Sequence, residues 1–148
     1  MERKKITSLI NATLIAPCGL NCALCYKFLT EKKNYCNGCL NGDENKALYC
    51  LNCKIKNCLQ YSGETKINYC FECQDFPCKR LKQLDKRYRK KYGTSIIDNL
   101  KIIQKYGMEK FIQDERKKWE CPNCNGILSI HIAECIFCGM PNQHYPRC

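Results

Sequence analysis

The chain has 148 residues, 45% of them hydrophobic, and a formal net charge of +11. This length allows one domain or two small ones, and no apolar run approaches the roughly 20 residues that a membrane-spanning helix needs, so we expect no membrane contact. Sixteen residues are cysteine, a content typical of a disulfide-bonded scaffold or a metal protein.

The first segment, residues 1–17, has the outline of a signal peptide, because a basic start precedes an apolar stretch. Polar residues such as Thr7 and Asn11 interrupt that stretch, and Pro17 stands directly before the first cysteine. We therefore expect a cytoplasmic protein, in which a reducing environment leaves the cysteines free to bind metal. Within this segment, residues 12–16 are predicted to form a strand.

Residues 1–79 are expected to form an N-terminal metal-binding module, since eleven cysteines fall between positions 18 and 78. Large apolar residues are only scattered there, too few for burial alone to offset the entropy of the chain. A structural zinc ion contributes about 10–16 kcal/mol to the folding of such modules. The module is therefore predicted to fold around metal.

Three cysteine pairs in this module share the pattern Y-C-x-x-C. Two thiolates at this spacing can turn onto one tetrahedral zinc ion, which takes four ligands. The first predicted site consists of Cys36, Cys39, Cys53 and Cys58. The second consists of Cys70, Cys73 and Cys78 with one of the three cysteines that open the module. We assign no role to Cys50, because Cys53 already serves in its pair.

The three opening cysteines are Cys18, Cys22 and Cys25, in the pattern C-x3-C-x2-C. The same spacing holds a 4Fe–4S cluster in radical S-adenosylmethionine enzymes, but those enzymes need a partial barrel for which this chain is too short. A helix that starts near Gly19 would place Cys22 and Cys25 about one turn apart. An iron–sulfur cluster, a zinc site or a set of reactive thiols would each fit these residues.

Residues 80–118 lack cysteine and are predicted to form three helices that pack on the module. An apolar stripe recurs at helical spacing along the first helix, and Gly93 is expected to end it. Ser95 is expected to cap the start of the second helix, and Gly107 to end that helix. The third helix is predicted over residues 108–119.

Residues 119–148 are predicted to form a C-terminal β zinc ribbon. Its ligands fall in two C-x-x-C pairs ten residues apart, and together they complete a four-thiolate site. The ligands are Cys121, Cys124, Cys135 and Cys138. Alternating apolar residues between the pairs predict a strand over residues 127–132, with His131 exposed on it. We assign no role to His144 or Cys148.

The motifs of the first half carry a family resemblance. Residues 16–25 read A-P-C-G-L-N-C-A-L-C, and residues 70–78 read C-F-E-C-Q-D-F-P-C. Together with the C-x4-C element at residues 53–58, they resemble an uncharacterised family of small cysteine-rich proteins from anaerobic bacteria and archaea. The resemblance covers residues 12–118, and the C-terminal ribbon looks like an appendage to it. It implies no activity, because the family is a domain of unknown function.

These patterns predict a small metal-stabilised α+β protein with an N-terminal multi-cysteine zinc-knuckle module, three short helices and a C-terminal β zinc ribbon. The sequence has neither a phosphate-binding glycine loop nor an H-E-x-x-H motif, so we expect a non-enzymatic protein with about three zinc ions. The basic stretch 79–91 predicts an adaptor for nucleic acid or protein partners. The alternative is an iron–sulfur or thiol-based redox or metal-handling protein of an anaerobe, centred on the three opening cysteines.

Overall fold

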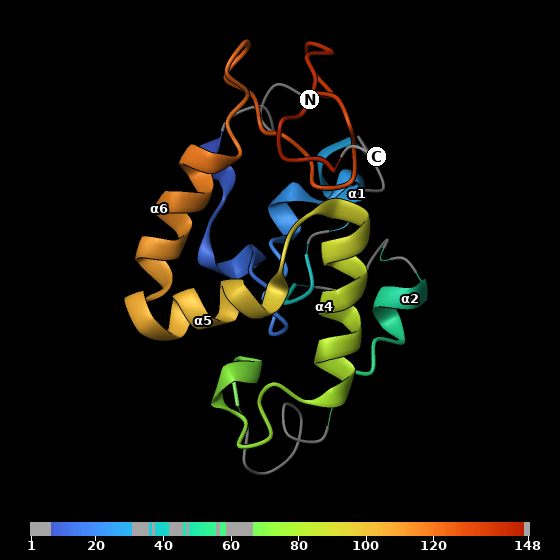
Figure 1. The fold of residues 1–148 in the computed structure, drawn as a ribbon, viewed down its shortest axis with the longest axis vertical. Helices are drawn as coiled ribbons and strands as arrows, with labels where there is room; N and C mark the ends of the chain where they lie inside the picture. The colour runs from blue at the N-terminus through green and yellow to red at the C-terminus, as the bar shows by residue number, and fades with distance from the viewer. Residues whose placement is uncertain are drawn as a thin grey trace.

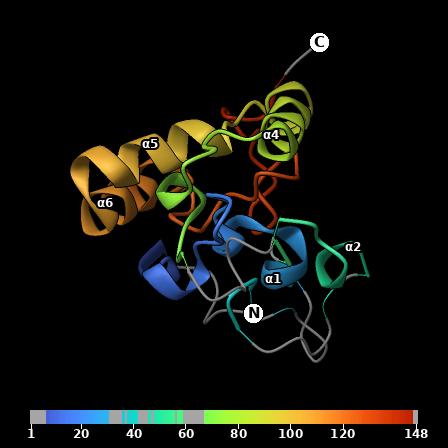
Figure 2. The same ribbon diagram turned by 90° about the horizontal axis from the view of Figure 1, so that it is seen from below.

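The computed structural model describes residues 7–30, 36, 38–41, 46, 48–55, 57–58 and 67–146. Three longer helices form one side of the molecule, and the N-terminal segment with two short helices forms the other (Figures 1 and 2). The longer helices are α4 (Lys79–Tyr92), α5 (Ile96–Tyr106) and α6 (Met108–Lys118), and the short ones are α1 (Tyr26–Thr30) and α2 (Leu48–Leu51). The C-terminal cysteine segment lies beyond the ends of α4 and α6 (Figure 1).

The three predicted helices are confirmed, and their ends fall where the sequence placed them. Gly93 ends α4 in the left-handed conformation, with a φ of 68°, which a glycine adopts without steric cost. The Ser95 hydroxyl caps α5 by accepting a hydrogen bond from the Asp98 N–H at 3.1 Å. Gly107 ends α5 and precedes the first residue of α6. Local sequence signals therefore fix this layer of the fold.

The strand predicted over residues 12–16 is wrong. Residues Ala12–Leu14 form a 3-10 turn instead, because the Asn11 side chain caps it by accepting the Thr13 N–H at 2.9 Å. Two further 3-10 turns, Cys22–Leu24 and Cys70–Glu72, each begin at a cysteine of the predicted metal motifs. The helix predicted from near Gly19 is likewise reduced to the turn Cys22–Leu24, which Asn21 caps.

The strand predicted over residues 127–132 is also wrong. The Leu128 N–H donates to the Trp119 carbonyl at 2.8 Å, and the Ile130 N–H donates to the Leu24 carbonyl at 3.1 Å. The segment therefore bonds to turns on both sides, and its Ile127 pairs with Glu120 only in an isolated antiparallel bridge. Within the described residues the sheet structure consists of isolated β-bridges, so the β part of the predicted α+β class is not formed there.

His131 is half-buried, and not exposed as the strand prediction required. Its Nδ1 atom accepts the Tyr26 N–H at 3.2 Å. Its ring meets that of Tyr92 edge to face, with 4.8 Å between the centroids. Burial lowers the pKa of His131, so the ring serves as a neutral contact between α1 and α4 at physiological pH.

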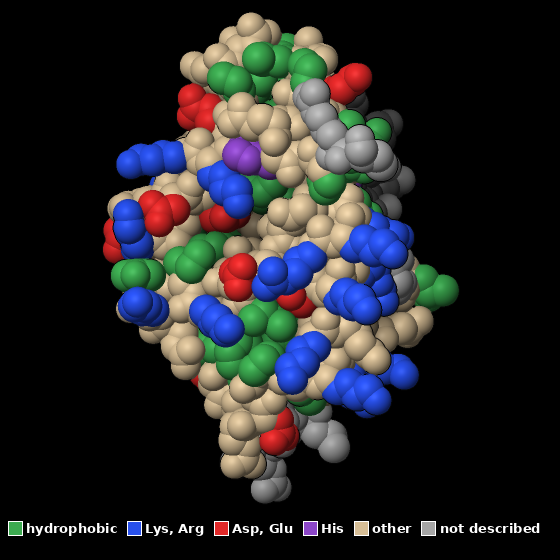
Figure 3. Space-filling view, viewed as in Figure 1, with side chains coloured by type: hydrophobic (Ala, Val, Ile, Leu, Met, Phe, Trp, Pro, Cys, Tyr) green, Lys and Arg blue, Asp and Glu red, His purple; other side chains and the backbone are tan. Residues whose placement is uncertain are grey.

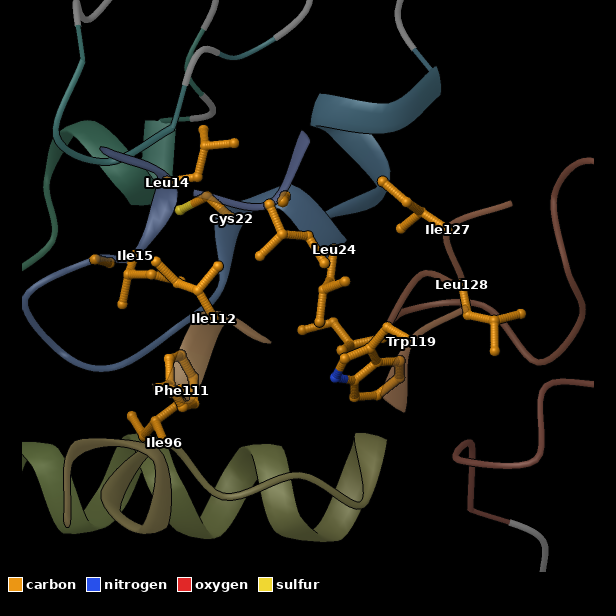
Figure 4. Close-up of a cluster of buried hydrophobic side chains, with 14 of the residues drawn as sticks. Leu14, Ile15, Cys22, Leu24, Ile96, Phe111, Ile112, Trp119, Ile127 and Leu128 are labelled. Carbon is orange, nitrogen blue, oxygen red and sulfur yellow. The ribbon is translucent and has the colours of Figure 1, made fainter. Parts of the chain in front are cut away.

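One buried hydrophobic cluster draws on all parts of the described chain. In Figure 4, Phe111, Ile112 and Trp119 from the third helix and its end lie among residues of the N-terminal turns and of the C-terminal segment. Burying a large apolar side chain contributes about 1.5–3 kcal/mol, so the helices and the cysteine-rich segments stabilise one another. None of the helices in the described ranges has the length and apolar content needed to cross a membrane.

Two polar contacts join the opening cysteine segment to the helices. The buried Asn21 side chain donates to the Glu115 carboxylate of α6 at 3.1 Å, and the Asn99 side chain of α5 donates to the Gly19 carbonyl at 3.0 Å. Gly19 has a φ of +92°, and a Cβ atom there would lie 2.5 Å from the Ile96 carbonyl oxygen. The close approach of the opening segment to α5 thus depends on a glycine at this position.

Candidate metal centre

Four cysteine thiols gather near the C-terminus, and we refer to them as the C-terminal cysteine cluster. It consists of Cys121, Cys124, Cys135 and Cys138. Their sulfur atoms all lie within 4.8 Å of one another, and the Cys121–Cys138 and Cys124–Cys135 sulfur pairs are each 3.7 Å apart. A tetrahedral zinc ion with Zn–S bonds of about 2.3 Å needs sulfurs about 3.8 Å apart. The cluster therefore has the spacing of a four-thiolate metal site.

The two halves of the cluster are built by the same backbone turn. In each half, the N–H of the first cysteine, Cys121 or Cys135, donates to the carbonyl five residues later at 2.7 Å. The carbonyl of the same cysteine accepts the N–H four residues later at 2.9 Å. The residue at that position is Asn125 in one half and Gly139 in the other, with φ values of 62° and 80°. Asparagine and glycine are the residues that tolerate this conformation best.

The pKa values of the cluster are uneven because its thiols differ in burial and in the hydrogen bonds that they accept. Burial raises the pKa of Cys135 to about 12, although the N–H groups of Phe137 and Cys138 partly oppose the shift. The pKa of the exposed Cys138 falls to about 6, first because the Asn123 side chain hydrogen-bonds its sulfur. A metal ion would supply the positive charge that deprotonates the buried thiols, and its binding would release their protons.

Residues outside the cysteine pairs anchor the cluster, and the sequence analysis missed the most buried of them. The Asn142 side chain donates to the carbonyls of Ser129 at 2.8 Å and Ile132 at 3.1 Å, and is 1% exposed. It ties the end of the second cysteine turn to the segment between the turns. His144 packs against Trp119, and its Nε2 atom lies 2.6 Å from the Lys118 carbonyl, which gives this histidine a structural contact.

The eleven N-terminal cysteines are all within the described residues, and none of them forms a disulfide. Cys18 and Cys22 are buried, and the other nine are half-buried. Several backbone N–H groups point at sulfur in this region, among them Gly38 at Cys36 (3.4 Å), Cys39 at Cys22 (3.5 Å) and Asp75 at Cys73 (3.4 Å). Such bonds favour the thiolate form, which is the form that binds metal.

Cys22 and Cys50 are influenced by thiols that the spacing of the sequence had not grouped with them. The pKa of Cys22 is raised to about 12, mainly by burial and also by the nearby thiols of Cys39, Cys25 and Cys36. The pKa of Cys50 is raised to about 11 by burial, by the same three neighbours and by Cys53. Cys50 thus lies among candidate ligands, a position that the sequence did not predict. Cys148 lies outside the described residues.

Among the described residues, the C-terminal cysteine cluster is the group whose ligand atoms all lie within 4.8 Å of one another. The ligand roles expected for the N-terminal cysteines remain predictions. This includes the zinc site or iron–sulfur cluster expected at the opening cysteines Cys18, Cys22 and Cys25.

Residues 14–83 match the model of a protein family described as "Protein of unknown function (DUF3795)". The chain resembles that family over this region. The match confirms the resemblance inferred from the cysteine motifs, although it is shorter than the expected 12–118 and leaves out α5, α6 and the C-terminal cysteine cluster. No curated protein and no solved structure matches the chain.

Proposed function

We propose that this chain is a zinc-binding adaptor without enzymatic activity, and that α4 binds the phosphate backbone of nucleic acid. The observation that carries the proposal is the outer face of α4, whose lysine and arginine side chains are exposed to solvent. They include Lys79, Arg80, Lys82, Lys86, Arg87, Lys90 and Lys91. Figure 3 shows basic side chains spread over this part of the surface. Such a row of cations attracts phosphate groups without reading base sequence.

Arg89 differs from the other cations of α4. Its guanidinium donates to the buried Asp85 carboxylate at 2.6 Å and approaches Asp98 at 3.4 Å. This arginine therefore has a structural role between α4 and α5, and we assign the phosphate contacts to the exposed lysines. Bound zinc limits the net attraction, because three four-thiolate sites would lower the formal charge from +11 to about +5.

Zinc is the metal that best suits the C-terminal cysteine cluster. Four thiolates at tetrahedral spacing are typical of zinc or of iron, and closed four-cysteine zinc sites usually serve as structural supports. The cluster lies against the buried Trp119 and the core, where a metal ion would hold two turns in place. This position supports a structural metal, with binding carried by the helical surface.

The test is a salt titration of binding to labelled mixed-sequence RNA and duplex DNA, followed by fluorescence anisotropy. We expect affinity to fall as salt rises, with about 0.9 in the logarithmic slope for each phosphate contacted on duplex DNA. The triple variant Lys82→Gln, Lys86→Gln, Lys90→Gln should lower the slope by about two to three.

The matched control removes three lysines from the exposed surface of α5 and α6. It consists of Lys101→Gln, Lys105→Gln and Lys117→Gln, and it changes the net charge equally. We expect a much smaller change in slope for this variant. Absence of binding at low salt would contradict the nucleic-acid role and direct the search to protein partners. An equal reduction of the salt slope in both triple variants would show that the phosphate contacts are not specific to α4.

The redox alternative would use reactive thiols or an iron–sulfur cluster at the opening cysteines. The burial of Cys18 and Cys22, at 7% and 8% exposure, favours structural ligands over reactive thiols, which are usually accessible. Metal analysis of protein purified without oxygen separates the two functions. Zinc alone supports the adaptor, whereas iron with sulfide would support redox chemistry.

A further inference from the structure

A cavity within the region that the family model matches is lined by four other cysteines. They are Cys58, Cys70, Cys73 and Cys78. The cavity has a volume of about 40 Å³, more than the roughly 10–15 Å³ that one water molecule needs. Ile55, Phe76 and Leu81 supply apolar walls. Thiols and apolar groups around a small cavity are the surroundings expected for a closed structural metal site.

We propose that Cys58, Cys70, Cys73 and Cys78 bind one zinc ion as four thiolates, and we call them the second cysteine cluster. Their sulfurs do not all lie within 4.8 Å of one another, so metal binding would draw them together from the walls of the cavity. This inference deepens the proposed zinc-binding role by assigning a second site and its ligands. It pairs Cys58 with the F-P-C motif, where the spacing of the sequence alone had placed Cys58 with Cys36, Cys39 and Cys53.

A backbone turn places two of these cysteines, Cys70 and Cys73, three residues apart at the cavity. Cys70 begins the 3-10 turn Cys70–Glu72, and the Cys73 N–H closes it by donating to the Cys70 carbonyl at 3.1 Å. The Asp75 N–H then donates to the Cys73 sulfur at 3.4 Å. A turn that places two cysteines three residues apart and directs an N–H at sulfur favours binding of both thiolates to one cation.

The other two cysteines approach from separate elements. Cys78 is the N-cap residue of α4 and makes no side-chain capping bond there, so its sulfur lies at the positive end of a 14-residue helix. Cys58 ends a turn in which its N–H donates to the Ile55 carbonyl at 3.2 Å. Ligands from two further segments would thus fasten the middle of the chain to the start of α4.

Charged side chains at the edge of the cavity would balance part of the charge of such a site. Lys54 and Arg80 also line the cavity, and their positive charges would offset part of the net −2 charge of zinc with four thiolates.

None of the three opening cysteines lines the cavity. The Cys22 sulfur accepts the Cys39 N–H at 3.5 Å. Cys18 lies close to Cys70, whose N–H donates to the Pro17 carbonyl at 2.9 Å, but it does not line the cavity. The lining therefore favours Cys58, and not an opening cysteine, as the fourth thiol. Cys53, which the sequence placed with Cys58, does not line the cavity either.

The experiment measures zinc per chain in the full-length protein after gel filtration, and the absorption of the same protein reconstituted with Co²⁺. Cys58→Ser and Cys73→Ser should each lose about one equivalent of zinc and reduce the thiolate-to-cobalt absorption. The double variant should lose one equivalent and not two, because both residues would bind the same ion. Cys135→Ser measures the C-terminal cysteine cluster separately, so a loss of zinc from that cluster can be told apart from a loss at the second cysteine cluster. Full zinc in Cys58→Ser, or the loss of two equivalents in the double variant, would overturn the assignment.

A second measurement uses the unmutated chain and does not depend on the folding of a variant. Reconstitution with NMR-active cadmium allows each metal to be correlated with the Cβ protons of its ligands. We expect one cadmium coupled to Cys58, Cys70, Cys73 and Cys78. Coupling to any other set of four, or iron with sulfide in the protein as isolated, would overturn the proposal.

Discussion

The two cysteine-rich regions of this chain differ in how their thiols come together. The C-terminal cysteine cluster takes its thiols from residues 121–138, through two copies of one backbone turn. The region matched by the family model carries eleven cysteines over residues 18–78, and any grouping of its thiols depends on how turns, α4 and the core are packed. The first arrangement can be predicted from sequence spacing, whereas the second depends on the tertiary fold.

This difference leads to different expectations for stability. A local cluster holds its own turns, so loss of its metal should release one segment of the chain. The N-terminal cysteines are fastened by contacts with α5 and α6, among them the Asn21–Glu115 hydrogen bond across 94 residues. Their arrangement should therefore respond to changes in the helices as well as to changes in the thiols.

The largest expected effect is the loss of the C-terminal cysteine cluster. Cys135 is buried at 3% exposure within the hydrophobic core. Cys135→Ser should remove one zinc equivalent and cost at least about 3 kcal/mol of unfolding free energy, because structural zinc is a main source of folding energy in such segments. Metal analysis and thermal unfolding measure the two effects. Cys148→Ser is the control, since the sequence assigns that cysteine no role, and equal losses in both variants would contradict the assignment.

The next effect tests how the N-terminal module is attached to α5. Gly19→Ala should cost about 2–4 kcal/mol, because a Cβ atom would meet the Ile96 carbonyl oxygen at 2.5 Å in a backbone of positive φ. Gly107→Ala is a matched control, since Gly107 has the same φ of +92° and no atom within 4 Å of the added Cβ. Urea unfolding of both variants separates the steric clash with Ile96 from the strain of the positive φ, because only Gly19→Ala has both. Equal losses of unfolding free energy in the two variants would show that the close contact with α5 contributes little.

The same contrast explains how much the sequence could predict. The three helices have local signals, such as Ser95 at the start of α5 and Gly107 at its end, and the C-terminal cysteine cluster has two evenly built pairs. The strand predicted over residues 127–132 failed because the N–H groups of its alternating apolar residues donate to the Trp119 and Leu24 carbonyls, which belong to turns and not to a strand. Asn142, Glu115 and the neighbours of Cys50 carry no local signal, since their partners lie elsewhere in the chain.

A contact without cysteine shows what the helices contribute by themselves. Burial alone would raise the pKa of Asp85, but hydrogen bonds from Arg89, Ser95 and the Ile97 N–H lower it overall. Asp85→Ala should cost about 2 kcal/mol at pH 7, because the Ile97 N–H loses its acceptor. A lowered pKa stabilises the fold above the unfolded value of about 3.9 and loses that effect as pH falls through the folded value.

The difference between Asp85→Ala and the wild type should therefore shrink in acid. Urea unfolding at pH 7 and at about pH 3 tests this expectation. Asp114→Ala is the control, because the Lys110–Asp114 pair is exposed on both sides and such pairs contribute at most about 0.5 kcal/mol. A difference that stays constant with pH would mean that the charge of Asp85 is not what stabilises the junction of α4 and α5.

The smallest expected effect concerns Glu115, which joins the two regions through Asn21. Burial raises the pKa of Glu115, although hydrogen bonds from the Asn21 and Trp119 side chains partly oppose the shift. A carboxyl group with a raised pKa favours folding while it is protonated, below its unfolded value of about 4.3, and loses that contribution as pH rises through the folded value. Glu115→Gln stays neutral throughout. Relative to the wild type, it should gain at most about 1 kcal/mol of unfolding free energy between pH 4 and pH 8.

Urea unfolding across this range gives the sign directly, with Glu109→Gln at an exposed position of α6 as the matched control. A gain that grows with pH in Glu115→Gln alone would mean that the opening segment tolerates a buried charge in order to keep its hydrogen bond to α6. A gain that declines with pH would instead mean that the ionised carboxylate is the better partner for Asn21. The module would then be held to the helices by charge as well as by thiols and packing, and the contrast with the C-terminal cysteine cluster would be sharper.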